Sequence, residues 1–113
     1  MAKPAQDPGD PGRVGDVVAY VFFRSPPQQR DSVRAAFGRL ALALRAAGLP
    51  APLGLAWRHE PARDDLTWLE TYGGPDLDSV RAQLLAVERL AADCGLSGLA
   101  TGARQIEIFE TCA

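Results

Sequence analysis

Six short segments with two different apolar periods follow one another along the chain, and their order limits the fold more than any other feature. Two segments, Val33 to Ala47 and Leu77 to Ala91, carry apolar residues at helical spacing. The other four are rich in β-branched and aromatic residues, as strands are, and cover residues 16–24, 53–59, 66–72 and 104–110. The order β-α-β-β-α-β predicts an α+β, ferredoxin-like fold. In this split arrangement a four-stranded antiparallel sheet carries both helices on one face.

Proline and glycine mark the boundaries of these segments. Residues 1–15 contain three prolines and three glycines without an apolar period, which predicts a flexible tail before a single domain at 16–113. Ser25, followed by two prolines and Gln28, is expected to cap the first helix, as in a capping box. Gly48 is expected to end that helix, and Gly95 the second one.

Composition and charge exclude several classes of function. Hydrophobic residues make up 47% of the 113 residues and charged ones 23%, which suits a chain with a core. Twelve basic and fourteen acidic residues give a net charge of -2, so neither nucleic acid nor an anionic membrane is an expected partner. Two cysteines and one histidine are too few for a Cys/His zinc site, and no metal or other cofactor is expected.

The same residues suggest a compartment. The chain has no apolar run long enough to span a membrane and does not begin with a secretory signal, so we expect it in the cytoplasm. Cys94 and Cys112 are expected as free thiols in that reducing environment, although the sequence also permits a disulfide between them.

The uncovered face of the predicted sheet is expected to be aromatic. Strand alternation puts Trp68, Glu70 and Tyr72 on one face of the third strand, and we expect this face to be the one without helices. There these residues would join Tyr20 and Phe22 of the first strand. So large an aromatic patch does not stay in water, which predicts that something covers it.

Two segments resemble a known group of proteins. The runs 20–24 (Tyr-Val-Phe-Phe-Arg) and 67–73 (Thr-Trp-Leu-Glu-Thr-Tyr-Gly), with Arg58 between them, resemble a small bacterial family of uncharacterised proteins in the dimeric α+β barrel superfamily. That superfamily also holds the antibiotic-biosynthesis-type monooxygenases. The resemblance covers Val17 to Phe109, and its most specific part is Thr-Trp-x-Glu-x-Tyr. It implies a homodimer whose two sheets close into a barrel around a ligand-sized cavity. The histidine and asparagine of the haem-degrading members have no counterpart in this sequence.

The first hypothesis is that the chain binds a small, mostly apolar organic molecule in this cavity, without a cofactor. The expected lining consists of aromatic side chains with polar anchors: Tyr20, Phe22, Arg24, Arg58, Trp68, Glu70 and Tyr72. Two alternatives stay open. One is a cofactor-independent monooxygenase- or isomerase-like enzyme, and the other is a structural or interaction module that fills the barrel with its own side chains.

Glu70 is the first candidate catalytic residue, because a carboxylate between two aromatic residues is costly unless it has a partner. The expected partners are Arg58, Arg24 and the hydroxyl group of Tyr20. Glu70 could act as a general base while Arg58 stabilises an oxyanion. Alternatively, the two form a cross-strand ion pair that fixes the hairpin register or the dimer seam.

His59 is the second candidate catalytic residue, because the pKa of histidine lies near neutrality. It could shuttle a proton or bind a metal or haem. The simpler interpretation is a partly exposed residue of the hairpin between the second and third strands. If Arg58 faces the cavity, its neighbour Trp57 faces the helices and belongs to the core.

Overall fold

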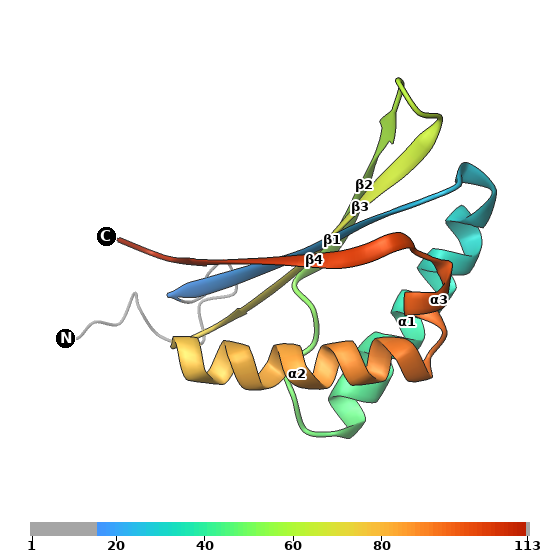
Figure 1. The fold of residues 1–113 in the computed structure, drawn as a ribbon. Coiled ribbons are helices and arrows are strands. Elements are labelled where there is room, and N and C mark those ends of the chain that lie inside the picture. Colours follow the sequence, from blue (N-terminus) through green and yellow to red (C-terminus); the bar gives the residue numbers. More distant parts are fainter. Residues whose placement is uncertain (1–15, 113) are drawn as a thin grey trace.

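Four antiparallel strands form one sheet, and the two long helices lie on one of its faces (Figure 1). The structure is a computed structural model and describes residues 16–112, so the predicted tail at 1–15 lies outside the described residues. The strands are β1 (Val17–Ser25), β2 (Gly54–Glu60), β3 (Asp65–Gly74) and β4 (Thr101–Glu110). The helices are the short 3-10 helix η2 (Pro27–Gln29), α1 (Arg30–Ala46), α2 (Leu77–Asp93) and α3 (Leu96–Leu99). The predicted ferredoxin-like α+β fold is confirmed.

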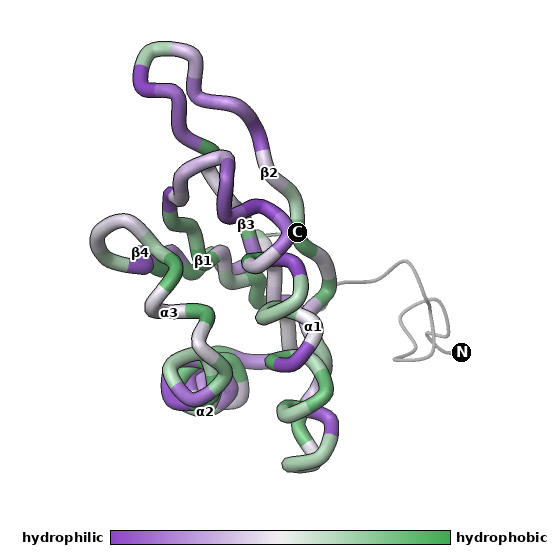
Figure 2. The backbone as a smooth tube through the Cα atoms, turned by 90° about the vertical axis from the view of Figure 1, so that its right-hand side faces the viewer, coloured by the Kyte–Doolittle hydropathy of each residue, from purple (hydrophilic) through white to green (hydrophobic). Residues whose placement is uncertain are grey.

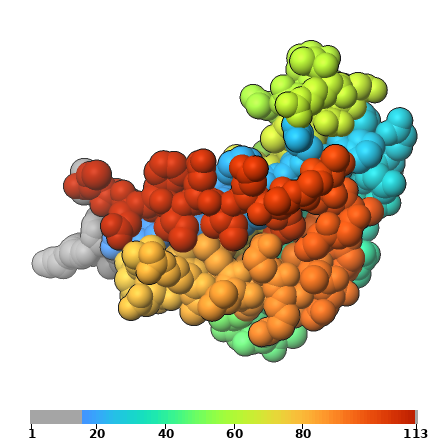
Figure 3. Space-filling view, viewed as in Figure 1, coloured from blue at the N-terminus to red at the C-terminus, as the bar shows by residue number. Residues whose placement is uncertain are grey.

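The sheet has the strand order β2-β3-β1-β4, so the first strand of the chain is central and the last is an edge. β1 pairs along its whole length with β3, from Val17 opposite Gly74 to Ser25 opposite Leu66. On its other side it pairs with β4, where the register shifts between Phe22 and Arg24. β2 pairs only with β3, and their hairpin protrudes from the body of the molecule (Figures 1 and 3). The outer end of this hairpin is hydrophilic (Figure 2).

The hydrophobic core lies between the sheet and the two long helices. Every second residue of β1 points into it, and the helices contribute residues three or four positions apart, as the apolar stripes predicted. The buried apolar residues of β1, α1 and α2 are Val17, Ala19, Val21, Phe23, Val33, Ala36, Leu40, Leu44, Val80, Leu84, Ala86, Val87 and Ala91. The stripes therefore place both helices against the same face of the sheet.

The start of the first helix differs from the prediction. Ser25 is the buried last residue of β1, and its Oγ accepts a hydrogen bond of 2.9 Å from the indole Nε1 of Trp68. The helix begins as a 3-10 turn at Pro27, and α1 follows with Gln29 at its N-cap and no side-chain cap. The predicted capping box is wrong because Ser25 satisfies the buried indole instead.

The ends of the long helices agree with the glycines in the sequence. Gly48 follows α1 with φ 77° and Gly95 follows α2 with φ 85°, a backbone conformation that other residues rarely adopt. The N-terminus of α2 is capped by Asp76, whose carboxylate accepts the backbone N–H of Ser79 at 2.8 Å. These ends fix how far the helices extend over the sheet.

Candidate functional site

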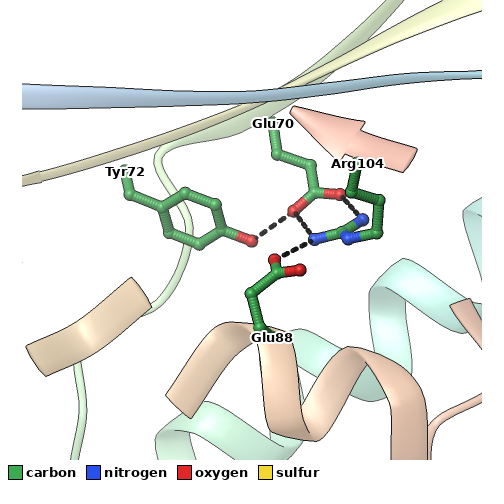
Figure 4. A network of polar contacts seen from close by, with 4 residues as sticks. All are labelled: Glu70, Tyr72, Glu88 and Arg104. Carbon is green, nitrogen blue, oxygen red and sulfur yellow. Dashed lines mark hydrogen bonds and ion pairs between the residues drawn. The ribbon is translucent and has the colours of Figure 1, made fainter. Parts of the chain in front are cut away.

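A buried network of charged residues joins the sheet to α2 (Figure 4). Arg104 of β4 donates two hydrogen bonds to the carboxylate of Glu70 on β3, one from each Nη. Its Nη2 also donates to Oε2 of Glu88 on α2 at 3.1 Å, and the hydroxyl of Tyr72 donates to Oε1 of Glu70 at 2.6 Å. The side chains of Arg104 and Glu70 are 4% and 0% exposed, whereas Glu88 is 38% exposed. The network therefore runs from the core to the surface.

This placement corrects the predicted face of the third strand. Trp68, Glu70 and Tyr72 are buried under the helices, and Leu69 lies on the uncovered face instead. The two large aromatic side chains gain more from burial than the threonines and Leu69 on the opposite face would, and Arg104 and Tyr72 satisfy the charge.

The contacts also correct the expected partners of Glu70. Arg58, Arg24 and Tyr20 were expected, but Tyr20 and Arg24 belong to the opposite face of β1 and Arg58 pairs with Glu60. Glu70 therefore forms a cross-strand ion pair, as one of the two interpretations expected, but its partner is Arg104 of β4 and not Arg58 of β2.

Electrostatics inside the network favour the ionised arginine and the neutral tyrosine. Burial, together with the charge of Glu70 and the hydrogen bond to it, raises the pKa of Tyr72 well above its usual range. Burial opposes the charged form of Arg104, but hydrogen bonds and charge from Glu70 and Glu88 outweigh it and raise the pKa of the guanidinium. The carboxylate of Glu70 is thus held by fixed donors and by no water-exposed group.

The uncovered face of the sheet carries the other half of β1. Tyr20, Phe22 and Arg24 lie on it, as predicted, and each is half-buried. The ring of Tyr20 meets that of Phe109 from β4 edge-on, with centroids 5.7 Å apart. Phe109 is 54% exposed, and Leu69 of β3 is exposed where it pairs with Phe22 of β1. This face therefore presents apolar side chains to its surroundings.

Two adjoining hollows lie over the hairpin end of this face. One, of about 320 Å³, is lined by Phe22, Phe23, Arg24, Arg58, Glu60, Thr67, Thr101, Gly102, Ala103 and Gln105. The other, of about 330 Å³, is lined by Phe22, Ala56, Trp57, Arg58, Thr67, Trp68 and Leu69. Both include Phe22, Arg58 and Thr67, so they form one groove, which we call the open-face groove. Four of the predicted ligand-binding residues line it: Phe22, Arg24, Arg58 and Trp68, the last with its side chain buried under the helices.

The β4 side of the groove depends on an irregularity in the sheet. Phe22 faces Gln105, but Arg24 faces Thr101, so β4 holds two extra residues at this point. Gly102 lies within the irregular segment with φ 83°, where a side chain would be strained. The irregular edge supplies Thr101, Gly102 and Ala103 to the wall of the first hollow.

His59 lies away from this groove. It is on the hairpin, 60% of its side chain is exposed, and its Nε2 is 3.5 Å from the Asp64 carboxylate. Trp57 has the predicted orientation toward the helix side, where it packs on Trp68 with centroids 5.3 Å apart. It is nevertheless 43% exposed, because β2 is an edge strand, so its expected place in the core is wrong.

Sequence reasoning missed Arg104 and Glu88. Arg104 lies on the same face of β4 as Ile106 and Ile108, because these residues are two positions apart. This pattern would have marked Arg104 as a charged residue that faces the helices and needs a buried partner. Glu88 carries no comparable signal, because it lies next to the apolar stripe of α2 and its side chain is partly accessible to water.

The described residues hold no other site of the kinds considered. Within 16–112, no group of three or more His, Cys, Asp or Glu side chains is arranged to hold a metal ion. None of the described helices is long and apolar enough to cross a membrane. Cys94 follows α2 and Cys112 follows β4, and both are free thiols in the structure.

Comparisons with known proteins show the same fold at low sequence identity. No family model and no curated protein matches the chain. A candidate antibiotic biosynthesis monooxygenase from Caulobacter crescentus CB15 superposes with a TM-score of 0.55 at 16% identity, over 88% of this chain and 93% of the other. Rv0793 from Mycobacterium tuberculosis gives 0.53 at 15% identity, over 88% and 97%. A mutant form of SnoaB, a cofactor-independent oxygenase from Streptomyces nogalater, gives 0.53 at 19%, over 86% and 94%. These likenesses confirm the predicted fold resemblance and show the fold alone.

Proposed function

We propose that this chain binds a small, mostly apolar organic molecule in the open-face groove, and that it does so as a homodimer whose second sheet covers the groove. The observation that carries the proposal is the groove itself. Each of its two parts, at about 320 and 330 Å³, reaches the volume of a small-molecule site. Phe22 and Leu69 offer apolar contacts, while Arg24, Arg58 and Gln105 offer donors that would orient a ligand.

The apolar side chains on the uncovered face support the homodimer. Phe109 is 54% exposed, and Leu69 and Tyr20 lie on the same face of the sheet. Covering these side chains contributes about 25 cal/mol for each Å² of apolar surface. A second copy would bring the same side chains to this face by two-fold symmetry. This is also what the resemblance to the dimeric α+β barrel superfamily implies.

An oxygenase- or isomerase-like enzyme is supported less well by the geometry. SnoaB has this fold and is a cofactor-independent oxygenase, but the shared fold does not transfer the activity. A proton-transferring residue must reach its substrate, and neither Glu70 nor His59 lines the open-face groove. Glu70 is fully buried and held by Arg104 and Tyr72. Binding therefore explains the arrangement with fewer requirements than catalysis.

The experiment measures assembly and binding together. N-phenyl-1-naphthylamine, an uncharged aromatic probe, should gain fluorescence when it enters the groove of a folded protein. Light scattering after gel filtration should give twice the chain mass of 12.1 kDa. Phe109→Asp should reduce this mass to that of a monomer, because it places a charge against apolar rings. Leu85→Asp is the matched control, because Leu85 is 76% exposed on α2.

Each outcome decides one part of the proposal. A folded dimer that does not bind the probe would refute ligand binding and favour an interaction module that fills the barrel with its own side chains. A monomer at high protein concentration would refute the homodimer. Equal effects of the two aspartate variants would remove the uncovered sheet face from the interface.

A further inference from the structure

One row of side chains crosses the floor of the open-face groove. Arg58 of β2 is paired in register with Thr67 of β3, and Thr67 is paired with Arg24 of β1. Because neighbouring strands lie about 4.8 Å apart, the backbones of the two arginines are about 10 Å apart with the threonine between them. All three residues line the first hollow, so two arginines and one threonine contribute to the wall of the same space.

One carboxylate occupies part of this row. Oε2 of Glu60 accepts a hydrogen bond of 3.2 Å from Nη2 of Arg58 and another of 3.2 Å from the hydroxyl of Thr67. Arg24 makes no ion pair with any residue in the described part of the chain. The row therefore holds two positive charges and one negative charge, with one guanidinium still free.

We propose that this row is a binding subsite for an anionic group of the ligand, and that Glu60 competes for it from within the protein. The inference rests on the proposed function and makes it more specific: the ligand joins an apolar ring system to a carboxylate, sulfonate or phosphate group. Guanidinium groups bind the oxygens of such anions through paired hydrogen bonds. The anion replaces the Glu60 carboxylate at Arg58 and Thr67 and reaches Arg24 as well.

Charge complementarity favours an anion over a neutral polar group. Arg24 is half-buried in the groove wall beside Phe22, and its charge has no ionic partner in the described part of the chain. The Arg58 side chain is 74% exposed, and an exposed ion pair such as Arg58–Glu60 is weak enough to exchange its partner. A ligand anion thus pairs the free guanidinium at little cost.

Two probes separate this subsite from the apolar part of the groove. 1-Anilinonaphthalene-8-sulfonate and N-phenyl-1-naphthylamine share their aromatic groups, and only the first carries a sulfonate. The readout is the ratio of their association constants, with the anionic probe in the numerator. Arg24→Gln should lower this ratio about tenfold, the size of a lost charge-assisted hydrogen bond. Glu60→Gln should raise it about threefold by removing the competing carboxylate.

The controls keep the inference separate from the proposed function. Arg45→Gln should leave the ratio unchanged, because Arg45 is exposed on α1 outside the groove. Circular dichroism confirms that each variant is folded. If the neutral probe binds and Arg24→Gln does not change the ratio, the anion subsite is refuted while the proposed function stands. If neither probe binds, the proposed function fails. A ratio that Glu60→Gln leaves unchanged refutes the competition.

Discussion

Replacement of Arg104 by methionine tests whether the buried network holds the helix face of the sheet together. The variant keeps an apolar side chain of similar length but removes three hydrogen bonds, two to Glu70 and one to Glu88. Glu70 is fully buried, so its charge would then keep only the Tyr72 hydroxyl as a partner. Loss of one member of a buried ion pair costs about 3–5 kcal/mol. We expect Arg104→Met to lower the free energy of unfolding by this amount.

A second substitution shows how much of this loss comes from the unpaired charge. Glu70→Gln keeps an acceptor for the Tyr72 hydroxyl but removes the charge. In that background Arg104→Met should cost only about 1 kcal/mol, because no buried carboxylate is left unpaired. The matched control is Arg58→Met, which breaks an ion pair that is largely exposed and should cost about 0.5 kcal/mol or less.

Urea unfolding, followed by tryptophan fluorescence, measures these differences. All variants must be compared at one protein concentration, because dimerisation would add to the apparent stability. Equal m-values would show that the unfolding reaction itself is unchanged. A loss below about 1 kcal/mol for Arg104→Met, or the same loss with and without Glu70→Gln, would show that the network does not stabilise the fold through paired charge.

Three further predictions concern groups outside this comparison. The chain has two tyrosines, so a Tyr20→Phe variant leaves Tyr72 as the only one that can titrate. Burial and a neighbouring carboxylate raise the pKa of Tyr72, so no phenolate absorbance should appear up to about pH 11. The stability that this shift contributes is full below about pH 10 and is lost only as the pH rises toward the folded value. Asp76→Ala should lower the melting temperature at pH 7, and by less at pH 3. The hydrogen bond from the backbone N–H of Ser79 lowers the pKa of Asp76, so the stability that the ionised cap contributes disappears as the pH falls through the folded value. Gly48→Ala should destabilise the fold by about 1 kcal/mol, because Gly48 has φ 77°. Gly38→Ala in the middle of α1 should instead stabilise it by about 0.5–1 kcal/mol, because alanine favours a helix more than glycine does. Thermal melts would measure both changes.

The order of the elements was predictable because local patterns carry it. Apolar periods and turn glycines depend on neighbouring residues alone, so the two long helices and four strands lie within a few residues of the predicted ranges. The alternation of β1 was equally local, and it correctly placed Tyr20, Phe22 and Arg24 on the uncovered face. Phe22 and Arg24, together with Arg58 of β2, are the part of the candidate site that the sequence could supply.

The face of β3 was not predictable in the same way. Alternation gives two sets of residues but does not say which set is buried, and the prediction put the set with Glu70 on the wrong face. The answer depends on Arg104, which lies 34 residues further along the chain and reaches Glu70 across β1. Ser25 is a similar case, because it accepts a hydrogen bond from the indole of Trp68, which lies 43 residues away. Long-range partners decide both positions, and single-sequence patterns do not contain them.

The two faces of the sheet therefore differ in what they require of their charged residues. On the helix face, each charge of the network has a fixed partner, and loss of Arg104 or of Glu70 leaves the other buried without its main partner. On the uncovered face, Arg24 has no ionic partner in the described chain, and Arg58 is itself exposed and pairs with Glu60. Substitutions there should alter binding without altering the free energy of unfolding of the subunit. The groove can thus change its ligand while the helix face keeps the fold, and that separation is what allows one fold to carry different functions.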